Sequence, residues 1–99
     1  MNVSKISDIT ADDLVEYLRI PDADATDKAT LNTLKGVAVE YIAQYTGRTQ
    51  EQLDLFQDLV IVAMILVEDM WDNRSNYVDN NNVNKVVESI LNLHVVNFL

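Results

Sequence analysis

The feature that most constrains this chain is an uninterrupted apolar run in its middle, from Leu59 to Val67. Several of these residues are β-branched, so a buried strand competes with a helix. The helix is favoured because no turn-forming residue interrupts the sequence from about Gln50 to about Asn73. A helix that is apolar on every side must lie at the centre of so short a chain, covered by the other helices. Any face that they leave bare is expected to meet a partner subunit.

Two helices are predicted before this central helix. Thr10, with Asp13 three residues on, resembles the capping box of a short first helix that stops before Pro21. The Asp22–Asp27 carboxylates then favour the positive end of a second helix. One stripe of that helix is apolar, and Gly47 stands at its expected left-handed end. The stripe consists of Leu31, Leu34, Ala38, Tyr41, Ile42 and Tyr45.

The central helix is predicted to begin at a second capping box, Thr49 with Gln52. A polar, asparagine-rich loop follows it over 75–84, and a short fourth helix spans Val83 to His94. The tail, 95–99, is apolar, which suggests docking because termini normally fray and are polar. With two glycines and one proline in 99 residues, the sequence predicts a single all-α domain. We expect a compact bundle of four to five helices with a long apolar central helix and an extended C-terminal tail.

The charge and composition exclude several functions. The net charge is −9 and is spread along the chain without a basic cluster. We therefore do not expect binding to nucleic acid through counterion release, or to anionic lipid through basic residues. The first eight residues lack the apolar stretch of a signal peptide, and Leu59–Val67 is far shorter than the roughly 20 residues that a bilayer requires. We expect a soluble, cytoplasmic protein.

Enzyme and cofactor signatures are absent from the sequence. There is no cysteine, no glycine-rich phosphate loop and no serine nucleophile motif. His94 has no neighbouring histidine or cysteine and is interpreted as structural or partly exposed. Asp22 and Asp24 resemble the start of a calcium loop, but no glycine turn follows and Thr33 stands in place of the closing glutamate. The sequence predicts a protein without catalytic residues, cofactor or metal.

The aromatic residues are spaced as core or interface residues. Core packing is the favoured interpretation for Tyr41, Tyr45 and Phe56, because stacking on nucleic acid requires interleaved positive charge. Trp71 lies in a mixed cluster that ends at Arg74. Two interpretations stay open there: a helix end whose dipole Arg74 complements, or a polar anchor across a subunit boundary.

Three pieces of the sequence, in this order and spacing, resemble the small head–tail connector, or adaptor, proteins of tailed bacteriophages and prophages. The first is Ile9–Ile20 with its Asp-rich link and the helix ending Tyr41–Arg48. The second is the apolar helix ending Met70–Arg74, similar to the family's aromatic-x-Asn-Arg ending. The third is Val87–Leu91 followed by the apolar tail.

The resemblance implies a virion protein whose copies, about twelve, form a ring beneath the portal protein. Such a ring extends the DNA channel and docks the next connector or tail protein through heterologous contacts. Without Lys or Arg beyond Lys85, a charge-based portal contact by the tail is not expected. The alternative is a monomeric acidic regulator, such as a DNA-mimic inhibitor. The candidate interface residues are Trp71, Arg74, Tyr77, Val95, Val96, Phe98 and Leu99.

Overall fold

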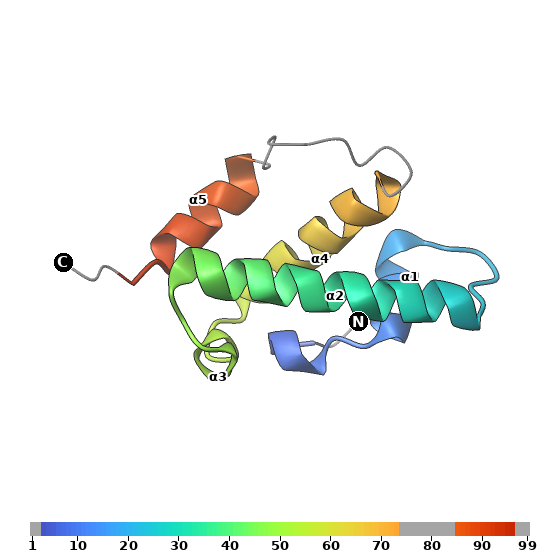
Figure 1. Ribbon diagram of the computed structural model, residues 1–99, viewed down its shortest axis with the longest axis horizontal. Helices are drawn as coiled ribbons and strands as arrows, with labels where there is room; N and C mark the ends of the chain where they lie inside the picture. Colours follow the sequence, from blue (N-terminus) through green and yellow to red (C-terminus); the bar gives the residue numbers. More distant parts are fainter. Residues whose placement is uncertain (1–2, 74–84, 97–99) are drawn as a thin grey trace.

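The computed structural model describes residues 3–73 and 85–96, and these form helices joined by short links (Figure 1). No strand occurs in these residues, which confirms the predicted all-α bundle. The elements in chain order are η1 (Ile6–Asp8, a 3-10 turn), α1 (Ala11–Leu18), α2 (Ala25–Thr46), α3 (Gln50–Leu53), α4 (Asp58–Asp72) and α5 (Lys85–Leu93). Among these helices, none combines the length and the apolar character needed to cross a membrane.

The ends of the helices follow the local chemistry of the sequence. Thr10 and Asp13 form the capping box predicted for α1. Asp24 forms a second box with Asp27 at the start of α2, so the acidic link satisfies the first amides of that helix. Gly47 ends α2 with φ 71°, a left-handed conformation that glycine adopts without a steric penalty.

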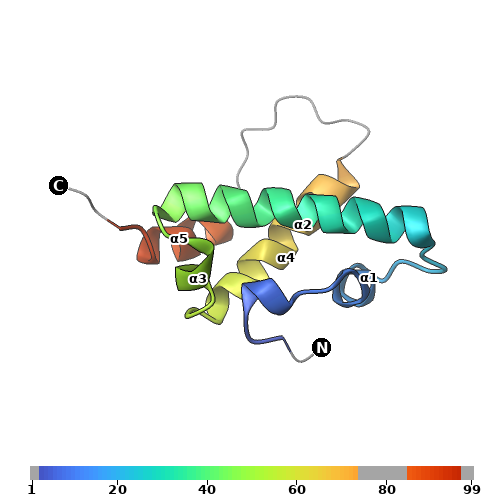
Figure 2. The ribbon, with the colours of Figure 1, turned by 60° about the horizontal axis from the view of Figure 1, so that its bottom comes forward.

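The apolar helix α4 is the centre of the bundle, as predicted. It packs against α2 along one side and also contacts α1, α5 and η1 (Figure 2). The core combines its buried residues with those of every other helix. Those of α4 are Leu59, Val60, Val62, Ala63, Met64 and Val67. One residue of the run, Ile61, is 42% exposed, so α4 keeps a narrow uncovered strip.

The predicted single helix from about Gln50 to about Asn73 is wrong, because the chain breaks into α3 and α4. An unbroken helix would place Leu55 one turn before Leu59 on the same, buried face. The break instead turns Leu53 fully into the core and leaves Leu55 76% exposed. Asp54, at the end of α3, accepts hydrogen bonds from the backbone N–H and the hydroxyl of Ser7, at 3.0 and 2.7 Å. These bonds hold the break against the N-terminal segment.

Candidate functional site

The C-terminal end of α5, the end of α2 and the α3–α4 link lie at the same end of the molecule (Figures 1 and 2). Arg48, just after α2, joins them. Its Nε donates a hydrogen bond to the His94 carbonyl oxygen at 2.7 Å, and its guanidinium lies 4.8 Å from the centre of the Phe56 ring. A cation over an aromatic face is attracted by the ring quadrupole. The side chain of Arg48 is therefore fixed from two directions.

His94 completes a stack with these two residues. Its ring centre lies 4.4 Å from that of Phe56, and its Nε2 is 2.8 Å from a carboxylate oxygen of Asp58. Asp58 is the first residue of α4, where a carboxylate also complements the positive end of the helix dipole. The single histidine thus ties the end of α5 to the start of α4.

The residues after α5 are held on the same chain by a backbone contact. The N–H of Val96 donates to the carbonyl oxygen of Thr46 at 2.8 Å. Thr46 is fully buried, and its hydroxyl donates to the Ile42 carbonyl at 2.7 Å. Tyr45 adds a further tie, because its hydroxyl donates to the side-chain oxygen of Asn92 at 2.7 Å. We call residues 94–96 the strap.

Three exposed apolar residues are next to members of this stack in the sequence. Leu55 precedes Phe56 in the chain, and Leu93 and Val95 flank His94. Leu93 is 78% exposed and Val95 42%. In the described residues these are three of the five large apolar side chains that are exposed, the others being Val37 and Ile61. We define the Arg48 end as Arg48, Leu55, Phe56, Leu93, His94 and Val95. Arginine and aromatic side chains are enriched in protein–protein interfaces.

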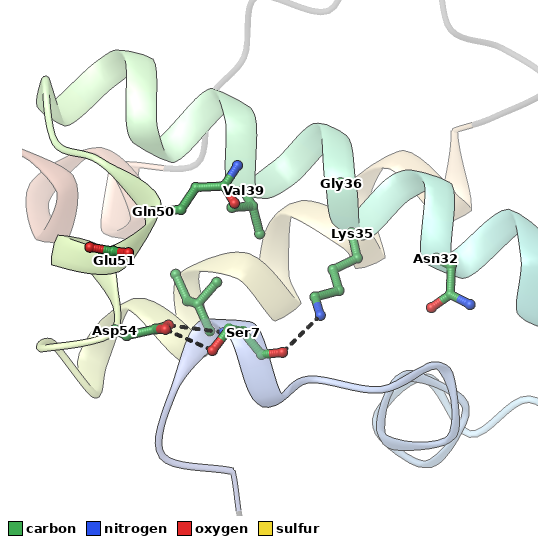
Figure 3. A pocket seen from close by; sticks show the side chains of 9 residues that line it. Ser7, Asn32, Lys35, Gly36, Val39, Gln50, Glu51 and Asp54 are labelled. Atoms are coloured by element: carbon green, nitrogen blue, oxygen red, sulfur yellow. Dashed lines mark hydrogen bonds between the residues drawn. The ribbon is translucent and has the colours of Figure 1, made fainter.

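A groove of about 550 Å³ lies on another side, between η1, α2 and α3 (Figure 3). Its floor includes Ile6, Gly36 and Val39. Two of its charged groups are hydrogen-bonded: the ammonium of Lys35 donates to the carbonyl oxygen of Ile9 at 2.6 Å, and Asp54 accepts from Ser7. The hydrogen bonds from the Ser7 hydroxyl and backbone N–H lower the pKa of Asp54. The two hydrogen bonds between Ser7 and Asp54 join η1 to the end of α3.

The described part of the chain contains no group of three or more His, Asp or Glu side chains placed to hold a metal ion. Asp22 and Asp24, which resemble a calcium loop in sequence, lie in the link between α1 and α2. Asp24 is engaged there as the cap of α2, accepting from the backbone N–H of Asp27 at 2.8 Å. The described contacts of Asp24 are therefore those of a helix cap.

The predicted interface residues fall in separate places. Val95 and Val96 lie in the strap, with Val95 exposed and the Val96 backbone bound to α2 of its own chain. Trp71 is half-buried near the end of α4 and packs against the core. It is thirteen residues from Asp58, or about 20 Å along the helix. Four predicted residues lie outside the described residues: Arg74, Tyr77, Phe98 and Leu99.

Sequence reasoning missed the partnership of Arg48, Phe56, Asp58 and His94. Arg48 follows the helix-ending Thr46–Gly47 pair, and Phe56 was interpreted as core. His94 was expected to be structural or partly exposed, and its geometry is of that kind, with 13% of the side chain exposed. No sequence pattern links these positions, because 36 residues separate His94 from Asp58 and 46 separate it from Arg48.

In the comparisons with known proteins, no family model, curated protein or solved structure matches the chain.

Proposed function

We propose that this protein is a structural subunit of the head–tail junction of a tailed bacteriophage or prophage. In this proposal its copies form a ring beneath the portal, extend the DNA channel and present a docking surface to the next connector or tail protein. The protein acts by binding other proteins and performs no reaction.

The observation that carries the protein-binding part is the Arg48 end. Its guanidinium is held by the His94 carbonyl and the Phe56 ring, and the residues that precede these two in the chain, Leu93 and Leu55, are exposed. Ordering a long side chain on binding costs free energy, so a side chain that is already ordered favours association. The exposed leucines at the same end offer apolar area that a partner would cover.

The connector part of the proposal rests on the sequence resemblance, supported by where its pieces lie. Ile9–Ile20 contains α1, Tyr41–Arg48 forms the end of α2, and Val87–Leu91 lies in α5. The order of a short helix, a long helix, an apolar helix and a short C-terminal helix agrees with the architecture that the resemblance implies. The strap and Arg48 then bring the first and third pieces into contact.

The test is to measure mass in solution and binding to a portal ring. Size exclusion with light scattering should detect a discrete closed species of about twelve subunits, alone or once portal rings are added. Electron microscopy of the mixture should place the added ring coaxially on one face of the portal. A chain that stays monomeric and leaves portal rings unchanged would sink the proposal. Tight binding of that monomer to a nucleic-acid-binding protein would favour the acidic-regulator alternative instead.

A further inference from the structure

The Arg48 end has the chemistry of a carboxylate receptor. Arg48 uses its Nε on the His94 carbonyl, and among the described residues it forms no ion pair. The terminal amino groups of a guanidinium donate well to a carboxylate. Leu55 and Leu93 are exposed at the same end of the molecule, so a matching partner segment carries a carboxylate next to an apolar side chain.

The same chain carries such a segment at its opposite end. Residues 8–27 contain seven Asp or Glu and one basic residue, Arg19. Within them, Pro21 and Asp22 are both exposed in the link between α1 and α2. Asp22 has φ 52°, a left-handed backbone conformation, and it directly follows Pro21, so an exposed carboxylate and an exposed apolar ring are neighbours in the chain. We define the acidic link as Pro21 to Asp24.

The two surfaces cannot meet within one molecule. The 22 residues of α2 separate them, a distance of about 33 Å at the rise of an α-helix. Figure 1 shows the link and the Arg48 end at opposite ends of the longest axis. Their contact must therefore join two copies, and each copy keeps one unused surface for the next.

We propose that the Arg48 end of one copy binds the acidic link of a second copy, with the Asp22 carboxylate on the Arg48 guanidinium and Pro21 against Leu55 and Leu93. A contact between two different surfaces is heterologous and closes into a ring when the rotation between copies permits. The inference rests on the proposed function, since it names the surfaces through which ring neighbours touch.

Two variants remove one surface each without touching the core. The receptor variant is Leu55→Asp/Leu93→Asp, at side chains that are more than three-quarters exposed. The link variant is Asp22→Asn/Asp24→Asn, because asparagine tolerates the left-handed conformation and still caps a helix. A matched control, Val37→Asp/Glu40→Gln, makes the same kinds of change at exposed positions in the middle of α2. Circular dichroism melting verifies that all three fold.

Sedimentation velocity at low salt, up to millimolar protein, gives the result. We expect wild type and control to associate alike, and each surface variant to associate at least about tenfold more weakly. An equimolar mixture of the two surface variants should form a heterodimer and nothing larger, because it retains one intact receptor and one intact link. Added salt should weaken wild-type association, since the central contact joins opposite charges.

Three results would overturn the inference. If either surface variant associates like wild type, its surface is not part of the contact. If the control associates as weakly as the surface variants, the effect is not specific to these surfaces. The third is a monomeric wild type that also fails to cross-link. Because the sequence has no cysteine, Leu93→Cys/Asp22→Cys with a short bismaleimide would capture even a weak contact as a ladder of linked chains.

These results are separable from failure of the proposed function. If both surface variants still form rings on a portal, the connector function stands and the surfaces assigned here are wrong. If the heterodimer forms but portal rings are never bound, the head-to-tail contact stands and the connector function falls.

Discussion

The Nε2 atom of His94 lies 2.8 Å from the Asp58 carboxylate, so the end of α5 is tied to the first residue of the central helix. On its other side, the backbone of His94 accepts the hydrogen bond of Arg48. The last described residues are therefore part of the domain and are fixed by polar contacts from two other segments. Docking of the apolar tail, 95–99, onto a partner stays a prediction; in the described part of the tail, the Val96 N–H binds the Thr46 carbonyl of its own chain.

Arg48→Ala should destabilise the fold, because it removes a partly buried hydrogen bond and the contact with the Phe56 ring. We expect a loss of about 1–2 kcal/mol in the free energy of unfolding. Urea denaturation followed by circular dichroism measures it. Arg48→Lys keeps the charge but lacks the planar group, so most of the loss should persist. If both variants unfold at the wild-type midpoint, the Arg48 side chain contributes nothing to stability.

The two glycines should respond to alanine with opposite signs. Gly36 lies inside α2, and an added Cβ would meet nothing within 4 Å, so Gly36→Ala should stabilise by about 0.5–1 kcal/mol. Gly47 has φ 71°, so Gly47→Ala should destabilise by about 1 kcal/mol or more. Each variant is the control for the other in thermal melts. A shift of both in the same direction would contradict this account.

The pH dependence of stability should include Asp54. The Ser7 hydroxyl and N–H lower the pKa of Asp54 from its ordinary value of 3.8, so the unfolded chain binds its proton more readily than the native one. This contribution to stability is complete above the unfolded-state pKa and is lost as the pH falls through the native one. Carboxyl NMR titration of Ser7→Ala should show the Asp54 pKa rising toward its ordinary value. An unchanged titration curve would remove Ser7 as the cause.

Shortening a side chain of the central helix should cost more stability on its buried face than on its exposed strip. Met64 is fully buried in α4, so Met64→Ala should cost about 2–5 kcal/mol through lost burial and a cavity. Ile61→Ala, three residues earlier at a 42% exposed position, should cost less than half as much. Chemical denaturation of both compares them directly. Equal losses would mean that α4 is not packed as described.

The helix ends could be predicted because each depends on residues a few positions apart. The Thr10 capping box and the Gly47 end are local chemistry that the sequence states directly. The central position of α4 followed from its composition. The break after Leu53 could not be predicted, because Ser7, 47 residues away, supplies the hydrogen bonds that hold Asp54.

The candidate site was less predictable than the fold for the same reason. The apolar character of Val95 predicts an interface residue, and this stays a prediction; Val95 is exposed at the Arg48 end. The sequence does not predict a site at Arg48 and Phe56, because a position after a helix end explains the first and core packing explains the second. Their joint role exists only when α5 returns to the end of α2.

The strap also bears on the order in which the molecule assembles itself. Its contacts join residues 36 to 50 positions apart, whereas α1 with α2 and α3 with α2 are neighbours in sequence. Closing a long loop lowers the entropy of the chain before the contacts that it allows are formed. Contacts between distant residues therefore tend to form late in folding. We expect the changes that loosen the strap to raise the unfolding rate and leave the refolding rate nearly unchanged. The Arg48 end would then be the last part of the chain to form and the first to open.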